Sequence, residues 1–124
     1  MVKTDKEKYT DILKESLSYL ENRGYENIKA DVEGYETPKS FSKVGSDVNI
    51  TPDIVAEKEG QRHYFELSLK SEEPSLLKSK WLFLSAMSAL KSHRFRIITT
   101  KGHYKFTNEM ISELNLNDKN LIKI

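Results

Sequence analysis

The sequence predicts a mixed α/β fold of the α+β type, built as one domain over residues 1–124. A length of 124 residues suits a single hydrophobic core. Three strand patterns in a row follow the first helical pattern, which favours an antiparallel meander. A strongly apolar helix then lies between the third and a fourth strand pattern, which indicates a parallel pair joined by a right-handed crossover. We therefore expect the order α-β-β-β-α-β-α.

The composition is typical of a globular protein. Hydrophobic residues make up 37% of the chain and charged residues 31%, which fits neither a disordered nor a membrane protein. No apolar run approaches the ~20 residues that span a bilayer, and the first residues carry no export signal, so we expect a cytoplasmic protein. The absence of cysteine excludes disulfides and thiolate metal sites. A net charge of +1 argues against a strongly basic nucleic-acid coat.

The first helix is expected from about Asp5 to Arg23. The run TDKE that begins at Thr4 is typical of a capping box, and Gly24 stands where a glycine often ends a helix. Apolar residues recur at helical spacing between these signals, at Tyr9, Ile12, Leu13, Leu17 and Leu20.

A strand and a long loop are expected next. Residues 28–34 (IKADVEG) alternate apolar and polar side chains, as a half-buried strand does. Residues 35–47 carry Pro, Gly and hydroxyl side chains, and loops of this length are often functional or mobile. Lys39, Phe41 and Lys43 interleave basic and aromatic residues there, which suits a nucleic-acid contact. The alternative is a solvated loop whose aromatic rings fold onto the sheet.

The stretch TPDIVAEKEGQRHYFELSLK, residues 51–70, predicts a hairpin around the turn Glu59-Gly60, because glycine suits the positive φ of a two-residue turn. In that register Val55 lies opposite Tyr64 and Asp53 lies opposite Glu66. The core face carries Ile54, Ala56, Phe65, Leu67 and Leu69. The other face carries Asp53, Val55, Tyr64, Glu66, Ser68 and Lys70.

The carboxylates of Asp53 and Glu66 would be cross-strand neighbours with Cβ atoms roughly 5 Å apart. Like charges so placed ask for a cation, and Mg²⁺ takes few carboxylates together with water and substrate phosphates. Lys70, further along this face, would polarise a phosphate or a water molecule. The alternative is the half-exposed face of an ordinary hairpin.

The second half of the chain predicts two helices around one strand. The second helix begins at residues 71–74 and is apolar over much of its circumference, so it should be buried. A strand is expected at residues 94–100, a third helix at 106–114, and a short strand or an extended end at the C-terminus. The crossover brings further basic side chains toward Asp53 and Glu66, namely Lys101 and His103 after the strand and Lys78 and Lys80 on the helix.

This order of elements, with Pro52-Asp53 and Glu66, resembles the PD-(D/E)xK nuclease superfamily, which has the restriction-endonuclease-like fold. Its αβββαβ core places Pro-Asp at its second strand and (D/E)-x-K on its third. The resemblance covers nearly the whole chain. It departs at the motif lysine, because Ser68 stands two residues after Glu66, and Lys70 is the nearest substitute on the same face.

The resemblance implies hydrolysis of phosphodiester bonds that depends on Mg²⁺ or Mn²⁺. Asp53 and Glu66 would be the metal ligands and would act in catalysis with Lys70, while Ser68, Lys101 and His103 would be accessory residues. The family often adds an acid from its first helix, for which the candidates are Glu15 and Glu21.

Two functions are consistent with these residues. One is a nuclease or DNA-processing protein that acts on nucleic acid, DNA rather than RNA, and that pairs as a homodimer to cut two strands. Its basic contacts would come from Lys39, Lys43, Lys78 and Lys80. The other is a module that keeps the nuclease fold, has lost the lysine, and binds nucleic acid or protein. The first predicts that Asp53 and Glu66 converge in an open cleft near a basic nitrogen, and the second predicts a covered or dispersed site.

Overall fold

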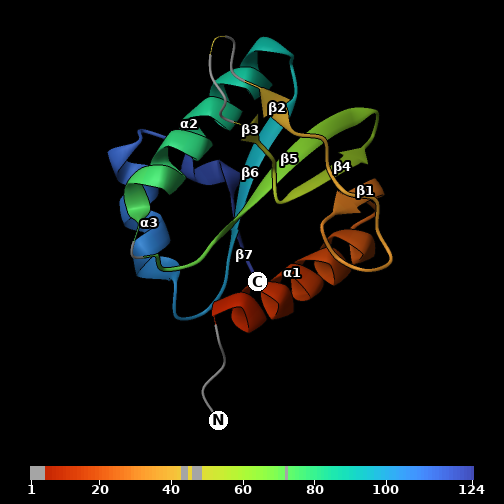
Figure 1. The fold of residues 1–124 in the computed structure, drawn as a ribbon, viewed down its shortest axis with the longest axis horizontal. Coiled ribbons are helices and arrows are strands. Elements are labelled where there is room, and N and C mark those ends of the chain that lie inside the picture. The colour runs from red at the N-terminus through yellow and green to blue at the C-terminus, as the bar shows by residue number, and fades with distance from the viewer. Residues whose placement is uncertain (1–4, 43–44, 46–48, 72) are drawn as a thin grey trace.

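The computed structural model describes residues 5–42, 45, 49–71 and 73–124. Thr4 of the expected capping box and Lys43 of the expected basic loop therefore lie outside the described residues. The elements are α1 (Asp5–Asn22), β1 (Glu26–Ala30), β2 (Phe41–Ser42), β3 (Asn49–Ile50), β4 (Ile54–Lys58), β5 (Gln61–Ser68), α2 (Pro74–Leu90), β6 (Arg94–Thr99), α3 (Tyr104–Glu113), the short 3-10 helix η1 (Asp118–Asn120) and β7 (Leu121–Lys123). The fold is thus mixed α+β (Figure 1).

The main sheet has five strands in the order β1-β4-β5-β6-β7. Strands β1, β4 and β5 form the antiparallel meander that the sequence predicts. Strand β6 runs parallel to β5 after the α2 crossover, and β7 runs parallel to β6 at the edge. The C-terminal tail is therefore a strand, and β5 lies at the centre of the sheet.

Helices cover both faces of this sheet (Figure 1). On one face Leu13 and Leu17 of α1 pack with Phe65 of β5. On the other face Trp81 of α2 and Met110 of α3 pack in a second core. Both faces of β5 are consequently buried. The polar side of the predicted hairpin is therefore covered at Tyr64, Glu66 and Ser68 of β5, beneath α2 and α3, whereas Arg62 at its turn end stays exposed.

The hairpin has the predicted register, with Val55 opposite Tyr64 and Ile54 opposite Phe65. Its two turn residues, Glu59 and Gly60, have φ values of 53° and 77°. Positive φ at both positions matches a type I′ turn, whose twist suits the strands of a hairpin. The local sequence thus determines which residues of β4 and β5 face one another.

The segment before this hairpin differs from the expectation. Strand β1 covers Glu26–Ala30 rather than residues 28–34, because the chain turns back after Ala30. The amide of Val32 donates to the carbonyl of Ala30 at 2.9 Å, and Gly34 takes a φ of 96°. The alternation in residues 31–34 therefore does not extend the strand.

The expected loop over residues 35–47 also carries structure of its own. Strands β2 and β3 form a small antiparallel sheet, with Phe41 opposite Ile50. Phe41 and Ile50 both pack against the core under α2. This small sheet is held by tertiary packing, which the composition of the segment does not reveal.

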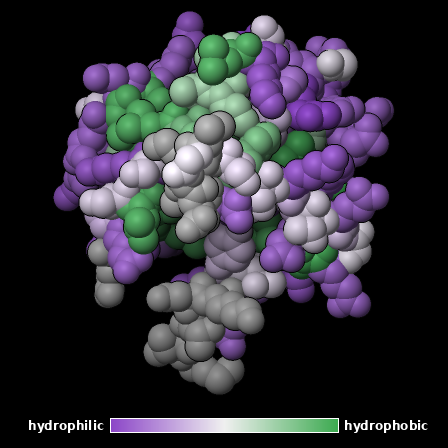
Figure 2. All heavy atoms as spheres, turned by 45° about the horizontal axis from the view of Figure 1, so that its top comes forward, coloured by the Kyte–Doolittle hydropathy of each residue, from purple (hydrophilic) through white to green (hydrophobic). Residues whose placement is uncertain are grey.

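The face shown in Figure 2 is mainly hydrophilic, with hydrophobic side chains gathered toward its upper part. The exposed large hydrophobic residues include Leu76, Leu82 and Leu90, all in α2. Of the helices in the described part of the chain, none combines the length and the apolar character needed to cross a membrane.

Candidate functional site

Asp53 and Glu66 meet where β4 begins, beside the carboxyl-terminal half of β5. The backbone amide of Asp53 donates to Glu66 Oε2 at 2.8 Å. The amide of Leu67 donates in turn to Asp53 Oδ2 at 2.8 Å. The two carboxylates are therefore neighbours, as the hairpin register predicts. Each is also held by a backbone amide, which offsets part of their mutual repulsion.

The amine beside these acids is Lys80 of α2. Its Nζ lies 3.0 Å from Glu66 Oε1 and 3.5 Å from Asp53 Oδ1. Leu77 and Leu84, one helical turn to either side, pack in the core beneath α2. Residues three and four apart share a helix face. Lys80 therefore lies on the same face of α2 as Leu77 and Leu84, and this face packs on the sheet.

Helix α1 adds a hydroxyl to this group. Tyr9 Oη donates to Asp53 Oδ1 at 2.8 Å, so this oxygen faces both the tyrosine and Lys80. The sequence pattern placed Tyr9 in the apolar stripe of the first helix, and its ring does pack against the core. The signal that was overlooked is that a largely buried tyrosine usually finds a partner for its hydroxyl group.

The four side chains lie in a poorly solvated environment. The side chain of Glu66 is 1% exposed, that of Asp53 14% and that of Lys80 26%. Burial, followed by the charge of Asp53, raises the pKa of Glu66 well above its ordinary value despite the nearby amine of Lys80. Burial also raises the pKa of the Tyr9 hydroxyl, and Asp53 adds to this shift. The raised pKa values mean that this cluster of side chains favours binding a proton or a cation.

Lys80 keeps its proton in this environment. Burial by itself would lower the pKa of the ammonium group, but the charges of Asp53 and Glu66 outweigh burial and raise that pKa. With Asp53 and Glu66 ionised and Lys80 protonated, these three residues carry a net charge of −1. The remaining negative charge suits a cation or the proton of a water molecule.

The carboxylates also fit a hard divalent cation. Glu66 Oε1 is buried, and its partner in the ion pair is Lys80 Nζ at 3.0 Å. Described residues do not gather three or more His, Cys, Asp or Glu into one metal-binding group. Asp53 and Glu66 alone would hold the ion, which agrees with the preference of Mg²⁺ for one or two carboxylates plus water and substrate phosphate.

Position 68, where the resemblance leads one to expect a lysine, belongs to a hydroxyl cluster. Ser68 is fully buried, and its Oγ lies 2.6 Å from Thr107 Oγ1 of α3. Thr107 Oγ1 donates to Thr99 Oγ1 at 2.9 Å, and Thr99 Oγ1 donates to the carbonyl of Ser68 at 3.2 Å. This cluster joins β5, β6 and α3 beside the carboxylates, so Ser68 is a packing residue here.

The other residues expected at the site lie apart from the carboxylates. Lys70 is exposed beyond the end of β5, where its backbone amide donates to His103 Nδ1 at 2.9 Å. Lys101 is exposed in the turn before α3, and Glu15 is exposed on α1. Glu21 accepts a hydrogen bond from Tyr35 instead. Within the described contacts of Asp53 and Glu66, none involves any of these residues.

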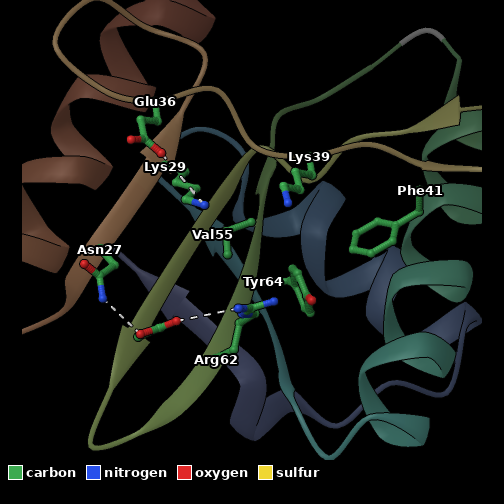
Figure 3. Close-up of a pocket in the computed structure, with 9 residues that line it drawn as sticks. Asn27, Lys29, Glu36, Lys39, Phe41, Val55, Arg62 and Tyr64 are labelled. Carbon is green, nitrogen blue, oxygen red and sulfur yellow. Dashed lines mark hydrogen bonds and ion pairs between the residues drawn. The ribbon is translucent and has the colours of Figure 1, made fainter.

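The basic residues expected to contact nucleic acid separate into different places. Lys80 belongs to the carboxylate group, whereas Lys78 forms an ion pair with Glu113 of α3. Lys39 lines a surface pocket together with Phe41 (Figure 3). Lys43 lies outside the described residues.

No family model, curated protein or solved structure matched this chain. Its class is therefore defined by its own geometry. It is a mixed α+β protein in which two carboxylates, an amine and a phenol converge beside the central strand.

Proposed function

We propose that this protein is a Mg²⁺- or Mn²⁺-dependent nuclease with the PD-(D/E)xK fold, which hydrolyses phosphodiester bonds in nucleic acid, DNA rather than RNA. The observation that carries the proposal is the convergence of Asp53, Glu66 and Lys80, with Lys80 Nζ 3.0 Å from one carboxylate and 3.5 Å from the other. Two acids and an amine are the groups that the motif requires.

The arrangement of elements supports the same proposal. The order α1, β1, β4, β5, α2, β6 corresponds to the αβββαβ core of that superfamily when the small β2–β3 sheet is treated as an insertion. Asp53 then precedes the second core strand and Glu66 lies in the third, as the motif demands. Helix α3 and β7 extend this core.

Lys80 resolves the departure at Ser68. A lysine at position 70 would lie about 6.6 Å further along the strand than one at position 68, and its side chain is exposed. Lys80 instead approaches both carboxylates from the helix above them. We infer that Lys80 takes the role of the motif lysine, in place of Lys70.

The chain's own groups would divide the reaction among them. Mg²⁺, held by Asp53 and Glu66, would supply Lewis-acid activation of water and of the phosphate. Tyr9 and the amide of Leu67 fix the orientation of Asp53 through their hydrogen bonds. The protonated Lys80 donates hydrogen bonds to the attacking water or to a phosphate oxygen, where negative charge develops in the transition state.

A second candidate is a nuclease-fold module that binds nucleic acid or protein without cleaving it. The observation that favours it is the burial of Glu66, which is 1% exposed and already ion-paired with Lys80. In a binding module the carboxylates and Lys80 would stay paired with one another and perform no chemistry. The two candidates therefore differ in whether substrate and metal displace the Lys80 ion pair.

The test is cleavage of labelled DNA and RNA in Mg²⁺ or Mn²⁺ by the parent protein, Asp53→Asn, Lys80→Met and Lys70→Met. We expect Asp53→Asn and Lys80→Met to lose activity by at least about a hundredfold, a typical loss for one transition-state donor. Lys70→Met should retain activity, and it is the matched control for removing a lysine. Equal activity in Asp53→Asn would overturn the assignment. No cleavage by a folded parent would leave the binding module as the function.

A further inference from the structure

A hollow of about 380 Å³ lies on the sheet face that carries Asp53 and Glu66 (Figure 3). Its floor is formed by β1, β4 and β5 and its far wall by Phe41 of β2. The side chains that matter here are Lys29, Lys39, Phe41, Val55, Arg62 and Tyr64. This volume falls within the range of small-molecule sites. The hollow is therefore large enough for one ring-bearing group.

The hollow begins one strand repeat from the carboxylates. Val55 is two residues from Asp53, and Tyr64 is two residues from Glu66. Side chains two apart on a strand point to the same face, about 6.6 Å from one another. Asp53 and Glu66 do not line the hollow themselves, but a ligand bound at them would have its neighbouring part about one strand repeat away, on the side of Val55 and Tyr64.

An aromatic ring is fixed at the wall of the hollow. Phe41 packs edge-on against Tyr64, with centroids 5.7 Å apart, and is tilted against Phe83 at 6.4 Å. Lys91 Nζ lies 5.5 Å from the centre of the Phe41 ring. Figure 3 shows the ring directed into the hollow between Lys39 and Tyr64. A ring held in this way and still partly exposed provides a platform for another flat ring.

The polar groups of the hollow are both donors and acceptors. Lys29 Nζ lies 3.9 Å from Glu36, and Arg62 lies 3.7 Å from Glu57. Glu57 also accepts a hydrogen bond from Asn27 at 3.0 Å. A nucleobase presents amino groups and ring acceptors that match such a mixture of donors and acceptors.

Lys39 supplies a positive charge that can contact the phosphate backbone of a nucleic acid. It is exposed at the rim, and across the described residues it has no acidic partner. A free cation beside an aromatic platform is the combination that single-strand binding grooves use, in which the charge follows the phosphates and the ring stacks a base.

We propose that this hollow binds an unpaired nucleotide next to the phosphate that a divalent cation at Asp53 and Glu66 would hold, so that the preferred substrate is single-stranded nucleic acid. The inference rests on the proposed function for the class of ligand. A base in a duplex is stacked and paired, and it would have to leave the helix to reach Phe41, which disfavours the duplex.

The test is the binding of a short fluorescein-labelled DNA single strand, and of its duplex, by fluorescence anisotropy in EDTA, which prevents cleavage. We expect the single strand to bind at least about fivefold more tightly than the duplex. Phe41→Ala should weaken single-strand binding at least about fivefold, since stacking on an aromatic ring contributes 1–3 kcal/mol per base. Phe41→Tyr should preserve binding, because it keeps the ring.

Lys39→Glu is the second variant, because an exposed lysine can be replaced without disturbing the fold. It should weaken binding and reduce its dependence on salt, as expected when a phosphate contact is lost. Lys119→Glu, exposed in η1 by the opposite edge of the sheet, makes the same charge change and should have little effect. Circular dichroism confirms that each variant is folded.

The outcomes separate this inference from the proposed function. Single-strand preference that depends on Phe41, in a parent that does not cleave, would support the hollow and refute the nuclease. Cleavage with no effect of Phe41→Ala or Lys39→Glu on binding would refute the hollow and support the nuclease. Equal or tighter binding of the duplex would also overturn the inference.

Discussion

Ser68 Oγ lies 2.6 Å from Thr107 Oγ1, in a pair that is fully buried between β5 and α3. This contact explains why position 68, where the proposed family would place a lysine, has no room for one. A longer side chain would enter the space of Thr107 and would place its charge among groups that already satisfy one another.

Restoring the motif should therefore damage the protein. We expect Ser68→Lys to lower the free energy of unfolding by roughly 3 kcal/mol or more, from overpacking and a buried charge, without any gain in cleavage. Ser68→Ala should cost only about 1 kcal/mol, the value of one hydrogen bond. Denaturant unfolding measures both variants. A stable and more active Ser68→Lys protein would show that Lys80 does not replace the motif lysine.

The hydrogen bond from Tyr9 to Asp53 predicts that the Tyr9 hydroxyl group contributes to stability and to activity. Tyr9→Phe removes a 2.8 Å bond to a carboxylate, and such bonds contribute about 1.5–3 kcal/mol. We expect a loss of stability near the lower end of that range and a fall in cleavage rate. Tyr19→Phe is the control on the same helix, where the ring lies against Arg23. Similar losses in the two variants would argue against a special role for Tyr9.

The raised pKa of Glu66 predicts how stability depends on pH. Because the folded pKa lies above the ordinary value of 4.5, this group contributes most stability below that value and less as the pH rises through the folded pKa. Glu66→Gln mimics the protonated form. It should be more stable than the parent at pH 8 and equal to it near pH 4, as measured by urea unfolding.

The control for this pH effect is Glu109→Gln, which changes an exposed glutamate of α3. Its stability difference from the parent should stay nearly constant between pH 4 and pH 8. If Glu66→Gln behaves in the same way as this control, burial does not raise the pKa of Glu66 in solution.

Metal binding should compete with protonation of the Glu66 carboxylate. Mg²⁺ or Ca²⁺ would raise Tm more at pH 8 than at pH 5, because Glu66 has to be ionised to bind the cation. At ten times Kd the stabilisation is about 1.4 kcal/mol. Asp53→Asn should abolish the shift, whereas Asp118→Asn, an exposed aspartate, should retain it. A shift that persists in Asp53→Asn would place the cation elsewhere.

The parts of the fold that depend on local rules were predictable. The hairpin register follows from the turn residues Glu59 and Gly60, and the crossover follows from the order of strands and helices. The predicted end of β1 was wrong, because the alternation of apolar and polar residues continues through residues 31–34, past the point where the chain turns. The β2–β3 sheet was missed because distant core residues hold it in place.

Only the part of the site that lies on paired strands was predictable from the sequence. Asp53 and Glu66 follow from cross-strand pairing, which is a matter of counting residues. The crossover predicts that several lysines can approach the acids, Lys80 among them, but choosing Lys80 over Lys70 requires the rotation of α2 above the sheet. Tyr9 arrives from a helix packed on the opposite face, and no sequence spacing relates it to Asp53.

The position of the amine on a helix changes how relatives of this chain should be sought. Along the sequence, the glutamate lies thirteen residues after the aspartate, a small hydroxyl residue follows two residues later, and the lysine comes fourteen residues after the glutamate, at positions 53, 66, 68 and 80. A search that requires lysine two residues after the acid passes over every protein arranged in this way. A pattern with a small hydroxyl residue two positions after the glutamate and a lysine on the following helix would find them.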